Sequence, residues 1–135
     1  MKSLLPIAIV LVLATAYGLW YQRSRGKVVV KSDKGLITQE MIGAPLGSRV
    51  TLVQFSSAFC SPCRATRMLL EDVTAEMSEV AYVEIDAEAH LELVRQLDIR
   101  STPTTLFVDR NGHEVGRAAG APKRDQVLSA ISAIR

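Results

Sequence analysis

Residues 50–63 read VTLVQFSSAFCSPC and predict a buried strand followed closely by the start of a helix. Residues 50–55 are mostly apolar or β-branched, which is typical of a strand inside a sheet. We expect the helix to run from Cys60 to about Met77, because Pro62 fits a first helical turn, where its missing N–H has no partner in any case. An apolar side chain at every fourth position predicts the buried side of this helix: Ala65, Leu69, Val73 and Met77.

Downstream of this unit, strands and helices are predicted to alternate. The expected elements are a strand at 80–86, a helix at 91–97, strands at 104–109 and 114–119, and a last helix at 123–134. The side chains expected to face inward from the two helices are Leu91, Val94 and Leu97, then Val127, Ile131 and Ile134. Strands separated by helices run parallel, whereas the turn at 110–112 indicates an antiparallel hairpin. The sequence therefore predicts an α/β fold, with a central mixed β-sheet flanked by helices.

The two cysteines of the chain, Cys60 and Cys63, lie three positions apart at the start of the first predicted helix of this fold. A disulfide-stapled scaffold would need more cysteines at wider spacing. Unpaired N–H groups and the positive end of the helix dipole stabilise a thiolate at Cys60 and lower its pKa. We therefore expect Cys60 to be the nucleophile that forms a mixed disulfide, and Cys63 to be the resolving thiol that releases the reduced target. The same steps in reverse would oxidise a target.

Two other interpretations of the cysteine pair remain open. Half of a zinc site would need two more ligands, and the only histidines are His90 and His113, which are far apart in sequence. The cysteines could also be packed and inert, although a C-x-x-C after a strand in a βαβ pattern favours redox chemistry. We predict no metal and no cofactor.

The N-terminal segment is apolar. Residues 3–22 contain no charged side chain for 20 positions, a length that spans a hydrocarbon core of about 30 Å. Trp20 and Tyr21 close the run, as aromatic residues do at the headgroup level. This predicts a transmembrane helix that contacts lipid through residues 3–22. The alternative is a cleaved secretory signal, with Ala14-Thr15-Ala16 as the cleavage site.

The charges are unevenly distributed along the chain. Five basic residues follow the apolar segment: Arg23, Arg25, Lys27, Lys31 and Lys34. Residues 36–135 contain 10 Lys and Arg against 13 Asp and Glu, so the globular part is slightly acidic and no nucleic-acid partner is expected. The positive-inside bias favours a domain that faces the cytoplasm, with the extracytoplasmic face as the alternative. The predicted organisation is an anchor at 1–22, a basic tether with domain entry at 23–46, which allows a short strand at 27–31, and one domain at 47–135.

Several motifs occur in a familiar order: Val53-Gln54-Phe55, Phe59-Cys60-Ser61-Pro62-Cys63, Val83-Glu84-Ile85-Asp86, Ile99-Arg100-Ser101-Thr102-Pro103-Thr104, and Gly112 with Gly120. From about Gly47 to Ile134 the chain resembles the thioredoxin family. The resemblance implies a thioredoxin-like fold, a redox-active disulfide and a cis peptide bond before Pro103. It also implies that the backbone of Thr102 pairs with a bound substrate chain. The substrate-binding residues it suggests are Phe59, Ser61, Pro62, Thr102 and Pro103.

The chain departs from the family pattern at three positions. Phe59 stands where a tryptophan is frequent, Gln54 where a buried acid is usual, and Tyr82 where a lysine is usual. Gln54 cannot act as a base, so activation of Cys63 must rely on water or another group. These departures favour a specialised membrane-tethered reductase, or a relative of the extracytoplasmic cytochrome-maturation thioredoxins.

The predicted function is that of a thiol–disulfide oxidoreductase that reduces protein disulfides and contributes to cell redox homeostasis. Its predicted partners are a disulfide-containing protein substrate and a thiol reductant that the sequence does not identify. The alternative is a membrane-tethered redox-sensing or binding module with the same fold and little turnover. A peroxide-reducing enzyme of this fold is disfavoured, because the threonine and arginine pattern around a lone cysteine is not evident.

Overall fold

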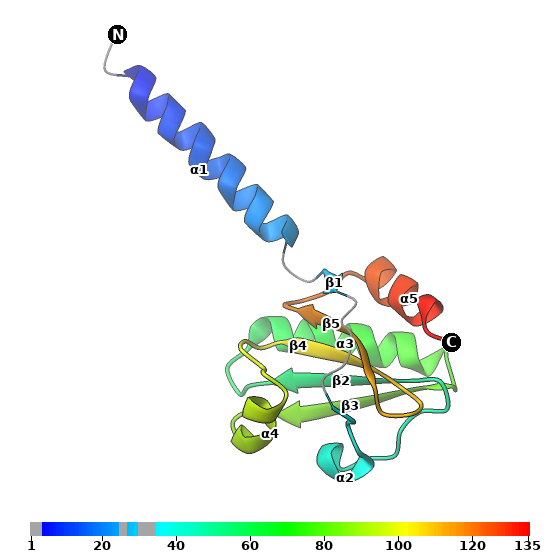
Figure 1. Ribbon diagram of the computed structural model, residues 1–135. Coiled ribbons are helices and arrows are strands. Elements are labelled where there is room, and N and C mark those ends of the chain that lie inside the picture. The colour runs from blue at the N-terminus through cyan, green and yellow to red at the C-terminus, as the bar shows by residue number, and fades with distance from the viewer. Residues whose placement is uncertain (1–3, 25–26, 30–34) are drawn as a thin grey trace.

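The computed structural model describes residues 4–24, 27–29 and 35–135. Its elements, in chain order, are α1 (Leu4–Ser24), β1 (Val28–Val29), α2 (Gln39–Ile42), β2 (Val50–Ser56), α3 (Ser61–Ala75), β3 (Val80–Asp86), α4 (Leu91–Gln96), β4 (Thr104–Asp109), β5 (Glu114–Ala119) and α5 (Arg124–Ala133) (Figure 1). From β2 onward this is the predicted order of strands and helices. Of the strand expected at 27–31, the structure contains residues 28 and 29 as β1, and residues 30 and 31 lie outside the described residues.

Within the described residues, one sheet of five strands forms the centre of the fold, in the order β1-β5-β4-β2-β3. β2 runs parallel to β3 and antiparallel to β4, so the predicted mixed sheet is confirmed. All seven residues of β2 are buried, because the strand has a neighbour on each side and helices over both faces. β1 pairs with the outer edge of β5, with Val28 opposite Ala118.

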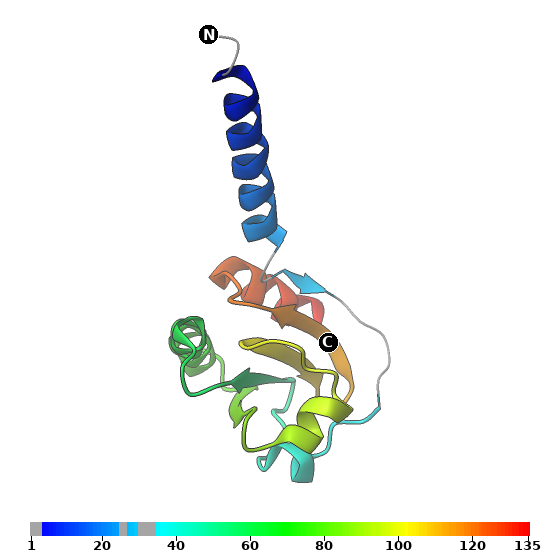
Figure 2. The same ribbon diagram turned by 90° about the vertical axis from the view of Figure 1, so that its left-hand side faces the viewer.

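Helices cover both faces of the sheet (Figure 2). On one face, α3 and α5 pack through Leu70, Val73, Val127 and Ile131 against Phe107 and neighbouring strand residues. The other face is covered by α2, α4 and the segments beside them, whose buried side chains are Ile37, Ile42, Leu93, Leu97 and Ile99. The two apolar clusters follow the alternation of strand side chains, since Leu106 and Val108 face one cluster and Phe107 the other.

The buried side of α3 differs from the predicted stripe. Its buried residues are Cys63, Thr66, Leu70 and Val73, whereas Ala65 is exposed. A spacing of four residues drifts around a helix of 3.6 residues per turn, and the observed spacings of three and four follow one face. In α4 the prediction is wrong at Leu91, which is 56% exposed while Leu93 is buried, and it is confirmed at Leu97.

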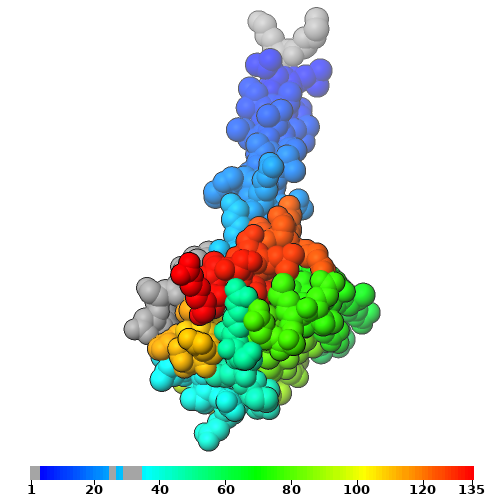
Figure 3. All heavy atoms as spheres, turned by 90° about the vertical axis from the view of Figure 1, so that its right-hand side faces the viewer, coloured from blue at the N-terminus to red at the C-terminus, as the bar shows by residue number. Residues whose placement is uncertain are grey.

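The N-terminal helix α1 projects away from the domain, and its end lies beside α5 (Figure 3). It has 21 residues, and none of them is buried. By length and composition it is able to cross a membrane, a property that a signal sequence near an N-terminus shares.

Candidate redox site

The two cysteines lie where β2 turns into α3. Cys60 is the N-cap of α3, with an extended backbone (φ −108°, ψ 97°), and Pro62 lies in the first turn. The backbone N–H of Cys63 donates a hydrogen bond of 3.2 Å to the Cys60 sulfur. A helix N-terminus has N–H groups without intrahelical partners, and here one of them is directed at sulfur. The local sequence therefore builds an anion-stabilising position around Cys60.

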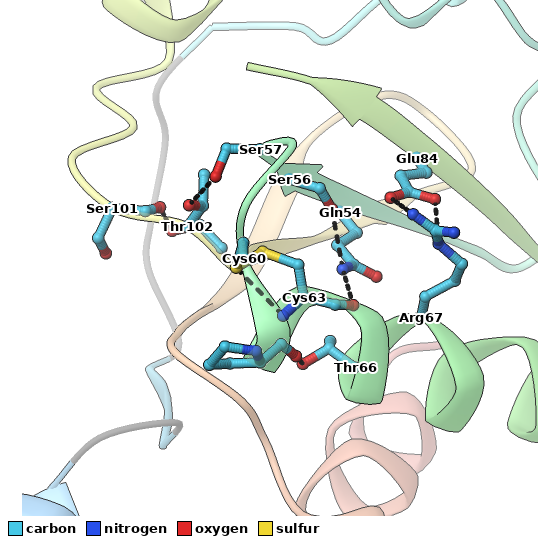
Figure 4. The surroundings of a disulfide bond; sticks show 12 residues. Gln54, Ser56, Ser57, Cys60, Cys63, Thr66, Arg67, Glu84, Ser101 and Thr102 are labelled. Carbon is cyan, nitrogen blue, oxygen red and sulfur yellow. Dashed lines mark hydrogen bonds and ion pairs between the residues drawn. A yellow bond between two sulfur atoms is a disulfide. The ribbon is translucent and has the colours of Figure 1, made fainter. Parts of the chain in front are cut away.

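Cys60 and Cys63 form a disulfide, with Cα atoms 5.2 Å apart (Figure 4). Cys63 is buried, with 2% of its surface exposed, and Cys60 is half-buried. The pair is therefore asymmetric, because a partner molecule approaching from solvent reaches the sulfur of Cys60 first. Among the described residues, no group of three or more His, Cys, Asp or Glu side chains is arranged to hold a metal ion.

A second loop lies against this turn. The peptide bond between Thr102 and Pro103 is cis. The hydroxyl groups of Ser57 and Thr102 are 3.0 Å apart and share a hydrogen bond, which joins the end of β2 to this loop (Figure 4). The Gly120 N–H donates to the Pro103 carbonyl at 2.8 Å, which fixes the loop from the other side. Ser57 was not predicted from sequence, since its contact depends on two segments 45 residues apart.

The residues predicted to bind substrate are not all equivalent in the structure. Pro62, Thr102 and Pro103 line one hollow, so the fold brings these three together. Phe59 and Ser61 are not among its described lining residues. Phe59 is nevertheless adjacent to Cys60 in the chain and has a fully exposed ring. An exposed aromatic ring beside a reactive sulfur offers apolar contact area to a protein partner.

Beneath the disulfide, Gln54 connects the sheet to α3. This residue is completely buried, and its Nε2 donates to the Cys63 carbonyl at 2.9 Å and to the Ser56 hydroxyl at 3.0 Å (Figure 4). Its Oε1 accepts a hydrogen bond of 2.8 Å from the hydroxyl of Tyr82. Burial first, and then the negative charge of Glu84, raise the pKa of Tyr82, so this phenol is a hydrogen-bond donor at neutral pH. The groups next to Cys63 in this network are therefore neutral.

Arg67 of α3 is paired with an acid and does not point at the sulfur. Arg67 points away from Cys60 and forms an ion pair with Glu84 of β3 at 2.6 Å (Figure 4). Its hydrogen bond to Glu84 and the carboxylate's charge raise the pKa of Arg67. The electrostatic support that the structure shows for a Cys60 thiolate is the helix N-terminus, where the Cys63 N–H is directed at the sulfur.

Comparison with known proteins gives consistent matches. A sequence model of the thioredoxin family matches residues 38–133. Thioredoxin H5 of Oryza sativa subsp. japonica is 28% identical over 102 residues, which are 76% of this chain and 75% of that protein. Thioredoxin of Chlamydia trachomatis is 28% identical over 97 residues, which are 72% of this chain and 94% of that protein. The solved structure of Fasciola hepatica thioredoxin matches with a TM-score of 0.59 and 26% identity, over 66% of this chain and 84% of that one. None of these three is described as a cytochrome-maturation protein, so that part of the resemblance stays a prediction.

Proposed function

Because the chain belongs to the thioredoxin family and is a thiol–disulfide oxidoreductase, we propose that it reduces protein disulfides while α1 anchors it in a membrane. The observation that carries this proposal is the Cys60–Cys63 pair at the start of α3, placed against the loop of Thr102 and Pro103. The family implies disulfide-containing proteins as substrates.

Cys60 is the proposed nucleophile. Its thiolate attacks one sulfur of the target disulfide, so that a Cys60–target disulfide forms, the target S–S bond breaks and one target thiolate leaves. The thiolate of Cys63 then attacks the Cys60 sulfur and releases the second target thiolate. Two electrons pass to the target, the leaving thiolates take up protons from solvent, and the protein ends as the Cys60–Cys63 disulfide. A thiol donor must then reduce this disulfide before the next turnover.

The substrate-binding role is assigned to Phe59, Ser61, Pro62, Thr102 and Pro103. Phe59, Ser61 and Pro62 are exposed around the disulfide, and Thr102 and Pro103 line the same hollow as Pro62. An extended target segment can place its backbone along Thr102 in the manner of an added strand. This arrangement selects for disulfides in accessible, extended segments.

The proposed organisation keeps residues 1–22 as the anchor in lipid, 23–46 as the tether and domain entry, and 47–135 as the catalytic domain. The basic residues after α1 favour the cytoplasmic side. There the thiol pool is kept reduced, which is consistent with a reductase supplied with electrons by a thiol donor.

The test uses the full chain in detergent micelles. With dithiothreitol as electron source, it should reduce the disulfides of insulin, and Cys63→Ser should trap protein partners on Cys60 as mixed disulfides. Cys60→Ser is the matched control, because it removes the outer sulfur and should do neither. Folded wild-type protein that neither turns over insulin nor traps partners would contradict the proposal.

A second candidate is a redox-sensing or binding module with little turnover. The neutral surroundings of Cys63 favour it, because Gln54 offers no proton acceptor to the resolving thiol. The same insulin assay separates the two functions, since a sensor becomes oxidised once and does not cycle.

A further inference from the structure

The end of the anchor helix and the loops beside the disulfide line one hollow. A cavity of about 480 Å³ is lined by Pro62, residues 101–103 and residues 119–121. Gln22 and Ser24, from the last turn of α1, complete its lining. This hollow, which Pro62 of the Cys60–Cys63 turn and the loop of Thr102 and Pro103 line, therefore opens next to the end of the proposed membrane span.

The connectivity of the chain enforces this proximity. Only three residues separate Ser24 from Val28, which pairs with Ala118 of β5. Two residues after Ala118, the N–H of Gly120 bonds to the carbonyl of Pro103. Even with the linker fully extended, these steps keep Pro103 within about 30 Å of Ser24. The site consequently stays close to the membrane in any orientation of the domain that preserves β1.

The level of this hollow relative to the bilayer follows from α1. Trp20 has an exposed ring and lies one turn before Ser24, a rise of about 6 Å along the helix. Aromatic residues at the end of a span lie at the headgroup level. Arg23 and Lys27 line a second cavity together with Lys123 at the start of α5. These cations suit a surface of anionic headgroups, so this side of the domain is placed to face the membrane.

We infer that the substrate disulfides lie in juxtamembrane segments of integral membrane proteins, within about 30 Å of the bilayer surface. This inference rests on the proposed function and adds the class of substrate. Such a segment enters the hollow along the membrane, passes Gln22 and Ser24, and extends past Thr102 to reach Cys60. Two electrons then move from the Cys60–Cys63 dithiol to the substrate disulfide, as described above. Confinement of both proteins to one membrane raises their effective concentration, whereas a disulfide far above the surface is out of reach.

The experiment places the full chain in vesicles of zwitterionic and anionic phospholipid with one of two single-span peptides. Both peptides carry the same small disulfide loop. In the proximal peptide the loop follows the span after about five residues, and in the distal peptide a helical spacer of about 40 residues lifts it by roughly 60 Å. The full chain is reduced before it is placed in the vesicles. The release of thiols from the peptide is then followed over a single turnover. We expect the proximal loop to be reduced at least about 10-fold faster.

A matched variant carries the same helical spacer between Arg25 and Gly26, which raises the domain and withdraws Gln22 and Ser24 from the hollow but leaves Cys60, Cys63 and residues 101–103 unchanged. It should lose the preference for the proximal loop and gain activity on the distal one. Equal rates for both peptides with the wild-type chain, or no reduction of either while insulin is still reduced in detergent, overturn the juxtamembrane inference alone. Failure to reduce insulin as well overturns the proposed function together with it.

Discussion

The hydroxyl of Tyr82 donates a hydrogen bond of 2.8 Å to Gln54, whose side chain in turn holds the backbone carbonyl of Cys63 at 2.9 Å. This chain of contacts crosses from β3 through β2 to the first turn of α3. It positions the inner cysteine while placing only neutral groups beside it. A neutral network can position the resolving thiol but cannot accept its proton. Kinetic measurements can separate these two roles.

Substitution of Gln54 by Glu should introduce a second titration into the resolving step. In the wild type, we expect the rate of mixed-disulfide resolution to follow a single thiol ionisation. A buried Glu has a raised pKa, so its ionisation should add a second inflection between about pH 5 and 9. Single-turnover rates from pH 5 to 10 give this profile. Gln54→Met is the control, because it removes the hydrogen bonds without adding an acid. An unchanged pH profile in the Glu variant would show that ionisation at position 54 does not affect the reactivity of Cys63.

The same variant has a predicted stability signature. Burial raises the pKa of the new carboxyl in the folded state above its unfolded value of about 4.3. The unfolded state then binds fewer protons, so the free energy of unfolding should fall as pH rises above about 4.3. Chemical denaturation of Gln54→Glu and Gln54→Met at several pH values separates this effect from the loss of the amide.

Tyr82→Phe should lower the free energy of unfolding by about 1–2 kcal/mol, because the buried Oε1 of Gln54 loses its donor. The wild type should also lose stability above about pH 10, where unfolded tyrosine ionises while Tyr82, with its raised pKa, stays protonated. Tyr82→Phe should have a shallower alkaline slope. Denaturation curves at pH 7 and pH 11 measure both effects, and equal slopes for the wild type and the variant would contradict the assignment of Tyr82 as a half-buried donor with a raised pKa.

Much of this site was predictable, and the rest depended on tertiary contacts. The position of Cys60 at a strand-to-helix turn followed from residue types and spacing within residues 50–63 alone. The contact of Tyr82 with Gln54 could not be found in the same way, because the register places Leu52 opposite Tyr82 and the side chain reaches diagonally to its partner. A diagonal contact between strands has no signature in either strand's periodicity. α2, with four residues, is too short to show any period.

A buried ion pair supports the loop before the cis peptide bond. Arg117 contacts Glu114 at 2.7 Å and donates to the carbonyls of Leu97 and Asp98. Since Glu114 is 3% exposed, Arg117→Met leaves a buried charge unpaired and should destabilise the protein by about 3–5 kcal/mol. Adding Glu114→Gln should restore part of this loss. Thermal unfolding of the single and double variants tests the pairing, and a double variant no more stable than Arg117→Met would argue against it.

The side of the membrane can be tested by labelling. Once the disulfide is reduced, Cys60 is the more accessible of the two thiols. A membrane-impermeant maleimide added to intact cells should leave it unlabelled if the domain faces the cytoplasm, and should label it after the membrane is permeabilised. Cys60→Ser controls for labelling of other proteins. Labelling in intact cells would place the domain on the outer side.

Phe59 offers a test that separates substrate contact from folding. Its ring is fully exposed, so Phe59→Ala should change the free energy of unfolding by less than about 0.5 kcal/mol. If the ring contacts protein substrates beside Cys60, the KM for insulin should rise about 5-fold or more, while reduction of a small aromatic disulfide stays unchanged. Met68→Ala is a matched control, because Met68 is an exposed apolar residue on the same helix as Cys63 and is 65% exposed. Met68→Ala should leave the reduction of insulin and of the small disulfide unchanged, because losing exposed apolar surface is not by itself expected to weaken substrate binding. Equal effects of Phe59→Ala and Met68→Ala on insulin reduction would show that the Phe59 ring does not contact the substrate specifically.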